Sequence, residues 1–496
     1  MKLPDYFDET MLKKRAELQR MNINPYPYSF HKTHDIQQIR DNEARLTDQS
    51  TTCSIVGRVT SLRSMGKSIF FDIMDNTASI QIYANKNSFD DYHWTMLSKL
   101  TDIGDIMNVT GYIFKTRMGE LSLHAENITI VCKSVVRIPY GKVTDDKTYN
   151  KVADPEIKYR ERYIFWQTDQ EYRRKIEMRF RITNLIRKWM EQEEFLEVLT
   201  PTIELVYGGA EARPFYTGIW ALDNQKAYLR ISPELYLKRY IASGFPKVFT
   251  ICQNFRNEGI DKSHNPEFTM MEWYEAGTDY VRQMERFEQL ISYLAKEIYG
   301  TMVITYQGRT IDLTPPWRRL SMTDAINEEI GKDVLQMDIN DIESYMSAHN
   351  IDFFEGQPKG MLIAHLFEAL CESKLIQPTF VIDHPLEISP LTKSKRGKPG
   401  FVERFEPYIN CMEIGNAYSE LTDPVEQFER LASQREIKTG DDFENHPVDY
   451  DFLKAVGVGL PPTGGVGIGI DRIIMLLTDS PTIRDIIPFP MMKPKY

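Results

Sequence analysis

The sequence predicts an α+β protein built from a small β-barrel and a larger domain of mixed helices and strands. Two observations carry this prediction: five short segments of strand character lie between residues 53 and 132, and an amphipathic helix pattern follows near residue 182. With 496 residues, of which 42% are hydrophobic, the chain is long enough for two or more packed cores.

The first part of the chain has the pattern of a five-stranded barrel. Its strand-like segments are CSIVGRVTSL, SIFFDIMD, ASIQIYAN, DIMNVTGYIF and ELSLHAENITIVC. Between the third and the fourth lies DYHWTMLSKL, which can form a helix. Five strands with a helix after the third are typical of an OB-type barrel, a fold that commonly holds single-stranded oligonucleotides.

Helix and strand patterns alternate in the larger part. Apolar residues recur at i, i+3, i+4 and i+7 from Ile182 to Trp189, and we expect this helix to end near Glu194. Further on, AYLRIS and KVFTICQNF are strand-like, with the helix pattern PELYLKRYIASG between them. Near the C-terminus, Asp423 before Pro424 predicts a capped helix start.

Composition limits the possible functions and locations. The net charge of −11 argues against indiscriminate nucleic-acid binding, because phosphate contacts depend on lysine and arginine. Residues 158–188 are rich in lysine and arginine, and form either a local basic surface or a solvated helix face. The N-terminus MKLPDYFDET lacks a secretory apolar run, and no apolar stretch approaches the roughly 20 residues of a membrane span, so we expect a cytoplasmic protein without membrane contact. The scattered cysteines include no CxxC pair, which favours reduced thiols over a zinc site.

Two stretches concentrate groups suited to a phosphate or nucleotide. FRNEGIDKSHNPEFTMMEWYE (residues 255–275) places Arg256, carboxylates and a histidine between apolar runs, as a charged loop between two core strands would. GLPPTGGVGIGIDRIIMLL (residues 459–477) has a glycine run before a short helix that carries Arg472. Such glycines allow a ligand close to the backbone, and equally allow tight packing of a helix on a sheet. Fewer than 30 residues follow the run, too few for a dinucleotide-binding βαβ unit.

Together these motifs resemble those of class II aminoacyl-tRNA synthetases. FLEVLTP resembles motif 1, and FRNEG, HNPEF and MMEWY, followed later by GIGIDR, resemble motifs 2 and 3. The chain is most similar to the lysyl-tRNA synthetases, through YLRISPELYLKR, RFE, EIGNAYSEL and TIRDIIPFP, and through MGK, IQIY and GELSLH in the barrel. The resemblance covers nearly the whole chain, and implies an N-terminal OB-fold followed by an antiparallel sheet flanked by helices.

The resemblance also implies how the chain is divided. It suggests an N-terminal helical extension at residues 1–50, an OB-fold anticodon-binding domain at 51–140, a linker at 141–165 and a class II catalytic domain at 166–496. The family acts as a homodimer through motif 1, which places Pro201 at the expected interface.

The reaction implied by the resemblance joins L-lysine to ATP, forms lysyl-adenylate and esterifies lysine to the 3′ end of tRNA(Lys). Arg256 and Arg472 are the implied catalytic residues. The implied ATP-binding residues are Arg256, Glu258, His264, Phe268, Glu406, Glu413 and Arg472. Glu406 and Glu413 would also hold Mg²⁺, which prefers carboxylate oxygens.

Lysine and the anticodon are the other implied ligands. The lysine-binding residues would be Glu234, Glu272, Tyr274, Asn416, Tyr418 and Glu420. Ammonium groups need negative partners when buried, and Glu420 with Tyr274 would face the ε-ammonium. Arg63, Phe70, Gln81 and Glu120 would read a U-rich anticodon by stacking and edge hydrogen bonds. Phe70 has an alternative as a core aromatic, since Phe71 beside it must point the other way.

Three alternatives share parts of this pattern. A related ligase that lysylates elongation factor P through the same adenylate lacks the barrel, so residues 53–132 count against it. A non-catalytic RNA-binding paralogue would not need Arg256, Glu406, Glu413 and Arg472. Aspartyl- and asparaginyl-tRNA synthetases share the architecture, but three carboxylates would not suit their pockets. One departure from the family pattern is RPFYTGIWALDNQKAYLR, which replaces a THHN-like run near Trp220.

Overall fold

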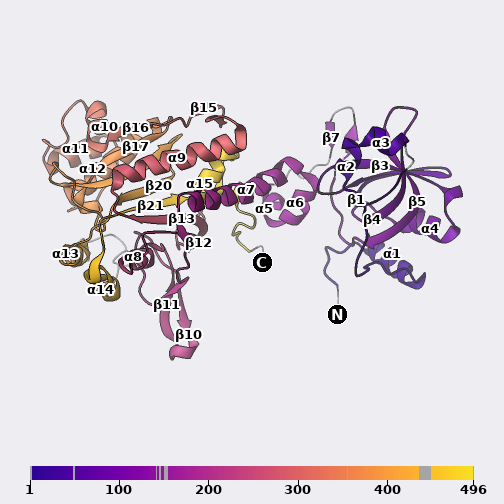
Figure 1. The fold of residues 1–496 in the computed structure, drawn as a ribbon, viewed down its shortest axis with the longest axis horizontal. Coiled ribbons are helices and arrows are strands. Elements are labelled where there is room, and N and C mark those ends of the chain that lie inside the picture. Colours follow the sequence, from indigo (N-terminus) through magenta and orange to yellow (C-terminus); the bar gives the residue numbers. More distant parts are fainter. Residues whose placement is uncertain are drawn as a thin grey trace. The chain divides into compact units, whose positions relative to one another are not determined.

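The chain folds into two compact units, Met1–Gln170 and Glu171–Tyr496. The computed structural model describes residues 3–48, 51–140, 142–144, 147–149, 155–354, 356–434 and 448–494, and Figure 1 labels the main elements. The domain boundaries expected from the resemblance stay a prediction. Residues 1–2 and 49–50 of the expected extension, and 141, 145–146 and 150–154 of the expected linker, lie outside the described residues.

The first unit contains a closed barrel with the strand order β1-β2-β3-β5-β4. Its strands are β1 (Thr52–Met65), β2 (Ser68–Met74), β3 (Ser79–Asn85), β4 (Ile106–Lys115) and β5 (Leu121–Cys132). Helix α4 (Asp91–Thr95), continued by a helical turn over Met96–Leu100, follows β3. Each predicted segment forms one strand, so the five-stranded barrel and its helix are confirmed. The burial of β2 alternates, because successive side chains point to opposite faces of a strand.

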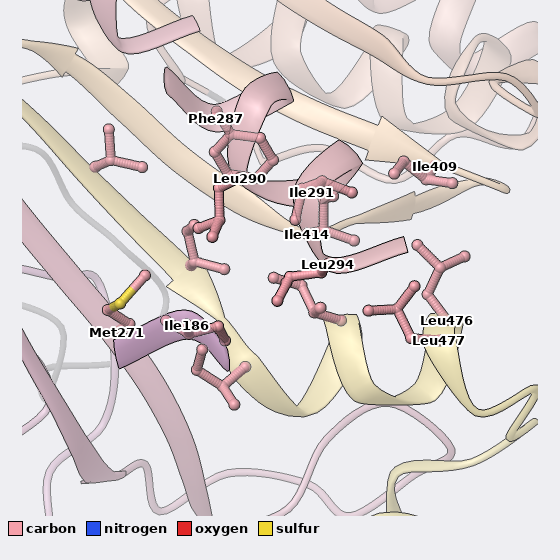
Figure 2. Close-up of a cluster of buried hydrophobic side chains, with 14 of the residues drawn as sticks. Ile186, Met271, Phe287, Leu290, Ile291, Leu294, Ile409, Ile414, Leu476 and Leu477 are labelled. Carbon is pink, nitrogen blue, oxygen red and sulfur yellow. The ribbon is translucent and has the colours of Figure 1, made fainter. Parts of the chain in front are cut away.

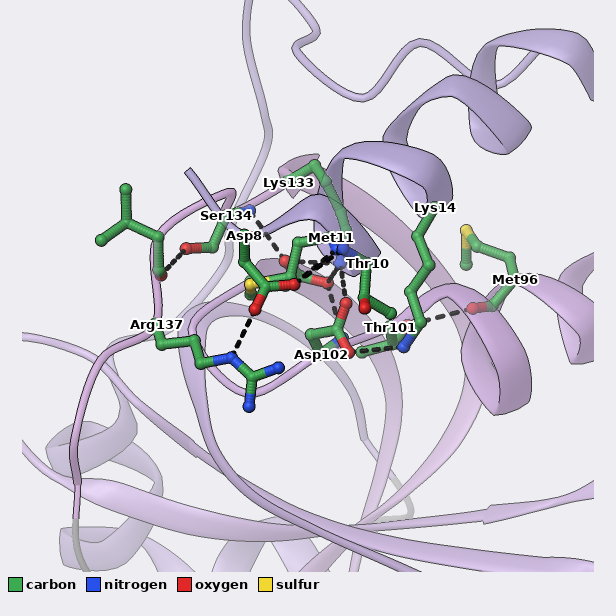
Figure 3. A network of polar contacts seen from close by, with 12 residues as sticks. Asp8, Thr10, Met11, Lys14, Met96, Thr101, Asp102, Lys133, Ser134 and Arg137 are labelled. Atoms are coloured by element: carbon green, nitrogen blue, oxygen red, sulfur yellow. Dashed lines mark hydrogen bonds and ion pairs between the residues drawn. The ribbon is translucent and has the colours of Figure 1, made fainter. Parts of the chain in front are cut away.

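Short elements surround the barrel strands. They are α1 (Glu9–Arg20), α2 (Ile36–Asp41), α3 (Glu43–Asp48), β6 (Lys142–Thr144), β7 (Lys147–Tyr149), α5 (Pro155–Arg160) and α6 (Arg162–Thr168). Asp8 caps α1 by accepting the amides of Thr10 and Met11, and it also pairs with Arg137 Nε at 2.5 Å (Figure 3). These contacts anchor the start of α1 to the chain that leaves β5.

The second unit is built on a large sheet in the order β16-β17-β18-β20-β21-β13-β12-β8, with β19 paired to β18. Its strands are β8 (Leu196–Glu197), β12 (Lys247–Phe255), β13 (Glu267–Ala276), β16 (Arg318–Ser321), β17 (Thr379–Pro385), β18 (Phe401–Ile409), β19 (Met412–Glu413), β20 (Gly415–Ser419) and β21 (Thr463–Gly469). The central pairs are antiparallel, as expected, whereas β16 with β17 and β12 with β8 are parallel.

One face of this sheet is covered by helices that form the main core. They are α7 (Gln170–Gln192), which ends close to the predicted position, α9 (Tyr280–Tyr299), α15 (Ile470–Leu477) and α16 (Ile483–Ile486). Phe287, Leu290, Ile291 and Leu294 of α9 are fully buried, and Figure 2 shows them among residues of the sheet and α15. Burial of each such side chain stabilises the fold by about 1.5–3 kcal/mol. Asp279 caps the start of α9 by accepting two backbone amides.

The remaining elements lie around the sheet. They are β9 (Ile203–Glu204), β10 (Tyr216–Ile219), β11 (Gln225–Leu229), α8 (Glu234–Ala242), β14 (Val303–Tyr306), β15 (Arg309–Asp312), α10 (Met322–Ile330), α11 (Ile339–Ala348), α12 (Lys359–Leu370), α13 (Pro424–Gln434) and α14 (Tyr450–Gly459). The unusual stretch near Trp220 forms the β10–β11 hairpin. Asp423 accepts the Val425 amide at 2.8 Å, so the predicted helix cap is confirmed. None of the helices in the described ranges is long and apolar enough to span a bilayer.

Candidate active site

A cavity of about 310 Å³ lies on one face of the large sheet. Strands β13, β20 and β21 contribute to it, together with residues at the start of helix α8 and at the start of α15. All the residues predicted to bind ATP or lysine line this cavity except Glu406 and Glu420. The structure therefore brings together side chains that are far apart in the sequence.

The glycine run leaves room for this cavity. Residues alternate between the faces of a strand, so the side chain of Val466 in β21 packs in the core, whereas Gly465 and Gly467 face the cavity. A Cβ added at Gly465 would lie 2.0 Å from Glu420 Oε1 and 2.5 Å from Tyr274 Cε1. A side chain at this position would displace both groups.

The charged stretch of residues 255–275 forms a hairpin, as predicted. Strands β12 and β13 pair antiparallel along their length, and the Arg256 amide donates to the Pro266 carbonyl at 2.9 Å. Phe268, Glu272 and Tyr274 occupy alternate positions of β13, so they share one face, and all three line the cavity.

Two arginines and a histidine lie at the part of the cavity predicted to bind ATP. The guanidinium carbon of Arg256 lies 5.2 Å from the centre of the Phe268 ring. Its buried Nε has no hydrogen-bond partner in the described part of the chain. Arg472 donates from Nη1 to the Glu413 carbonyl at 2.5 Å, and its Nη2 lies 3.4 Å from His264 Nε2. Burial lowers the pKa of Arg256, because it removes water from the guanidinium, and an anion in the cavity would offset this cost.

Asp261 holds His264 in its orientation. The two side chains meet at 2.8 Å between Asp261 Oδ2 and His264 Nδ1, and Asp261 Oδ1 also accepts the amides of Ser263 and His264. Burial acts to raise the pKa of Asp261, but these hydrogen bonds lower it to about 2. The carboxylate is therefore charged at neutral pH, and it directs His264 Nε2 toward Arg472.

Glu406 of β18 and Glu413 of β19 form a pair of carboxylates beside the cavity. Glu406 accepts from Arg404 Nη2 at 2.7 Å and from the Tyr408 hydroxyl at 3.2 Å. Burial and the neighbouring charge of Glu406 raise the pKa of Glu413. Among the residues that the structure describes, no cluster of three or more His, Cys, Asp or Glu could hold a metal by itself. The pair instead fits a hard cation that brings further oxygen ligands, as Mg²⁺ on phosphates does.

Three buried glutamates gather at the part of the cavity predicted to bind lysine. Glu234 and Glu272 are each 4% exposed, and Glu420 is 1% exposed. Glu272 accepts from the Ser232 hydroxyl at 2.8 Å and from the Tyr274 hydroxyl at 3.1 Å. Burial, together with the charge of Glu234, raises the pKa of Glu272 to about 8. This acidic cluster gains most from a cation, because carboxylates buried without a partner are costly.

A cation that the sequence pattern did not reveal lies among these glutamates. Lys238 Nζ is 2.6 Å from Glu234 Oε1 and 2.5 Å from Glu420 Oε2. The Tyr418 hydroxyl also donates to Glu234 Oε1 at 2.6 Å. The only sequence signal was the i, i+4 spacing of Glu234 and Lys238 in PELYLKR, since nothing links either residue to Glu420.

Two other side-chain pairs fix residues that line the cavity, and the sequence pattern did not predict either pair. Arg404 donates from Nε to Asn416 Oδ1 at 2.9 Å, which fixes the side chain predicted to contact lysine. Arg179 of α7 pairs with the buried Asp471 at 2.5 Å. Asp471 directly precedes Arg472, which lines the cavity. The start of α15 is thereby tied to α7.

The barrel residues predicted to read an anticodon lie at its outer surface. Phe71 is buried inside the barrel, so Phe70 points outward, which excludes the core alternative for Phe70. Arg63 is exposed and faces Phe70 in the β1–β2 pairing. Gln81 is half-buried on β3, and Glu120 is exposed before β5.

Further aromatic rings adjoin Phe70 on this surface. The Tyr83 ring lies 5.0 Å from Phe70 and 5.2 Å from His124, and His124 stacks on Tyr112 at 4.8 Å. The sequence pattern gave these rings no role, although their alternate positions on β3, β4 and β5 are a usable signal. Base stacking uses such surfaces.

Comparison with known proteins agrees with this architecture. Residues 154–493 match the family described as tRNA synthetases class II (D, K and N), and residues 53–131 match the OB-fold nucleic acid binding domain. The chain is 41% identical to a lysine–tRNA ligase of Methanoculleus marisnigri over 98% of this chain and 95% of the relative. It is 43% identical to one of Carboxydothermus hydrogenoformans over 98% and 97% of the two chains. A third, from Nostoc punctiforme, is 44% identical over 98% and 87%.

The chain belongs to the class II lysine–tRNA ligase family. The resemblance read from its motifs is thereby confirmed, as is the order of an OB-fold followed by a class II synthetase domain. The comparisons do not assign roles to single residues of this chain, and the assignments proposed below use the geometry of the cavity.

Proposed function

We propose that the chain activates L-lysine with ATP to lysyl-adenylate and then transfers lysine to the 3′ end of tRNA(Lys). The observation that carries this proposal is one cavity with two kinds of charge. Arg256 and Arg472 lie at one part of it, and the buried Glu234 and Glu272 at another, with Glu420 next to the lining residue Gly465. This arrangement suits a triphosphate beside a cationic amino acid.

In the first step, the lysine carboxylate attacks the α-phosphorus of ATP and pyrophosphate leaves. We assign Arg256 to the α-phosphate, Phe268 to the adenine face and Glu258 to the adenine amino group. Arg472 and His264 would hold the distal phosphates. The substrate carboxylate is already a nucleophile, so no protein base is needed, and fixed cations stabilise the charge that develops on phosphorus.

Glu406 and Glu413 would hold Mg²⁺ together with phosphate oxygens. When bound, the ion offsets phosphate charge during the displacement. The contribution of this chain is to keep both carboxylates in place, Glu406 through Arg404 and Glu413 through Arg472.

The acidic part of the cavity would hold the amino acid. The proposed contacts are Glu234, Glu272, Tyr274, Asn416, Tyr418 and Glu420. Glu420 and Tyr274 would face the ε-ammonium, since both approach Gly465 from the cavity side of β21. The ammonium groups would replace water with charged, hydrogen-bonded partners.

The barrel would bind the anticodon of the tRNA. Its outward Phe70, with Arg63, Gln81 and Glu120, offers a stacking ring and polar groups for base edges. The adjoining ring of Tyr83 extends this surface. We place the reaction in the cytoplasm, where tRNA is charged.

We also propose that the chain acts as a homodimer through the segment that contains FLEVLTP. Leu199 is 88% exposed and Leu196 51% exposed. Pro201 lies next to them in a surface groove with Tyr240 and Phe245. Exposed apolar residues gathered in one segment mark an interaction surface. Sedimentation equilibrium should give about twice the chain mass of 57.9 kDa, and a single species at the chain mass would contradict the dimer.

The elongation-factor ligase and the RNA-binding paralogue are less well supported. The barrel matches a nucleic-acid-binding family, which a ligase for a protein does not require. The cavity keeps Arg256, Glu413 and Arg472 in contact with open space, which a purely RNA-binding protein does not require.

The test is pyrophosphate exchange into ATP without tRNA, across lysine, aspartate, asparagine and arginine. Exchange with lysine alone is expected, because the glutamates repel aspartate, asparagine brings no positive charge, and the planar guanidinium of arginine differs in size and shape from a compact ammonium. Exchange with aspartate, or with none of the four, would contradict the proposal. Aminoacylation of tRNA(Lys) by the same preparation then separates the tRNA ligase from the protein ligase.

A further inference from the structure

Lys238 is a buried cation directly behind the acidic part of the cavity. Its side chain is 1% exposed, and it does not line the cavity itself. The ammonium lies 5.5 Å from the centre of the Tyr418 ring and 5.7 Å from that of Phe452. It contacts Glu234, which lines the cavity, and Glu420, which lies behind the lining next to Gly465.

Two elements bring these charges together. Helix α8 begins at Glu234, and the i, i+4 spacing places Lys238 on the same helix face. Glu420 follows β20, where its amide donates to the Thr463 carbonyl at 2.8 Å. The ammonium therefore ties the first turn of α8 to the strand end that carries Glu420.

The charges of the amino-acid part can be compared. Three carboxylates, those of Glu234, Glu272 and Glu420, are buried there, and the ammonium of Lys238 pairs with two of them. Without Lys238, these buried carboxylates would have one positive partner fewer, which is costly.

We infer that Lys238 is a positioning residue that sets the charge of the amino-acid site and so helps to select lysine. Its ammonium contacts both Glu234 and Glu420 and fixes the positions of their carboxylates. This inference rests on the proposed function. It adds a residue that never touches the substrate to those that determine specificity.

The groups around this cluster define a pH test. The titratable groups that face Lys238 and Glu420 are Glu234 on α8, Glu272 and Tyr274 on β13, and Tyr418 on β20. Strand β21 and helix α14 contact them through Gly465 and Phe452, which do not titrate. Burial raises the pKa of Glu420, and the ammonium of Lys238 opposes that rise. If Lys238 is removed, the pKa of Glu420 rises further, so lysine must more often displace a proton from it at neutral pH.

The experiment compares Lys238→Met with the unaltered enzyme in lysine-dependent pyrophosphate exchange between pH 6.5 and 9. We expect KM for lysine to rise at least about tenfold at neutral pH and to recover as the pH increases. KM for ATP should change less than about twofold, because the ATP part of the cavity keeps its charges. Lys238→Arg, which keeps the positive charge, should lie closer to the unaltered enzyme than Lys238→Met does.

Lys133→Met is the matched control, since Lys133 is a lysine equally buried between two carboxylates in the barrel unit. It should leave KM for lysine and its pH profile unchanged. If Lys238→Met does not fold, Lys238→Gln takes its place with the same expectation. The inference would be overturned if the KM values for lysine and ATP changed equally in Lys238→Met. It would also be overturned if KM for lysine stayed within twofold of the unaltered enzyme at all pH values. Absence of lysine-dependent exchange in the unaltered enzyme would instead refute the proposed function.

Discussion

Two buried lysines, one in each unit, show how similar ion clusters can serve different ends. Lys133 in the barrel unit and Lys238 in the catalytic unit are each 1% exposed. Each lies within hydrogen-bond distance of two carboxylates. The difference lies in the other charges that reach those carboxylates.

Around Lys133 the charges balance. Asp102 also pairs with Lys14 at 2.5 Å, so two carboxylates meet two ammonium groups (Figure 3). Asp105 further accepts the Ser134 amide at 2.8 Å. A cluster satisfied in this way has no use for a ligand, and it joins α1 to the end of β5.

Around Lys238 the charges do not balance. Glu272 adds a third carboxylate, and among the described residues no other lysine or arginine forms an ion pair with Glu234, Glu272 or Glu420. The cluster also opens on a cavity. A buried acidic group short of cations, next to open space, therefore indicates a cationic ligand.

The largest expected effect is that of Glu420→Gln. This change removes a buried partner of the substrate ammonium, which costs about 3–5 kcal/mol and raises KM for lysine roughly 100-fold or more. KM for ATP should change little. Steady-state exchange measures both constants, and equal losses would remove Glu420 from the lysine site.

Lys133→Met should affect stability instead of substrate binding. Removing the ammonium leaves Asp102 and Asp105 partly unpaired, and we expect the free energy of unfolding of the barrel unit to fall by about 3–5 kcal/mol. Urea denaturation followed by circular dichroism measures this loss. If the variant kept its stability but lost lysine affinity, the distinction between the two clusters would fail.

A smaller effect is expected from pH. The pKa of Glu272 is raised to about 8, so the free enzyme keeps a proton there at lower pH that lysine must displace. Lysine affinity should rise from pH 6 to pH 8.5, while ATP affinity stays flat. Because the folded pKa lies above the unfolded one, Glu272 also makes the empty enzyme less stable as the pH rises from about 4.5 to 8.

A variant without the Ser232 hydroxyl sharpens this prediction. Ser232→Ala removes a donor to ionised Glu272, so the midpoint of the lysine-affinity profile should move to higher pH. Profiles that do not depend on pH in either enzyme would show that Glu272 is already ionised.

The smallest effect concerns the barrel surface. Phe70→Ala should weaken tRNA(Lys) charging by about 1–3 kcal/mol, the usual contribution of one stacked base. Exchange without tRNA should not change, since Phe70 lies in the other unit. Thr60→Ala, on the preceding strand, is a control that removes no ring. Loss of exchange in Phe70→Ala would contradict a role limited to RNA.

Local patterns predicted most of the fold. The strands of the barrel followed from alternation, and the hairpin of β12 and β13 followed from two apolar runs around a charged loop. The choice between Phe70 and Phe71 could not be made in this way, because both residues fit a strand. Only the closed barrel decides which of them points inward.

The site was predicted less completely, because its support comes from distant parts of the chain. Glu234 and Lys238 are four residues apart, but their contact with Glu420 depends on how α8 meets the end of β20. The pairing of Arg179 with Asp471 likewise joins α7 to α15. Motifs identify the groups that meet a ligand, whereas the groups behind them are set by tertiary packing.

The most direct test of the central claim compares lysine with norleucine, which lacks the ε-ammonium, in pyrophosphate exchange by the unaltered enzyme. If the acidic cluster selects its substrate by the charge of the ε-ammonium, kcat/KM for norleucine should be at least about 1,000-fold lower than for lysine, because norleucine leaves the buried carboxylates unpaired. Comparable exchange with norleucine would show that the three glutamates do not determine the choice of substrate.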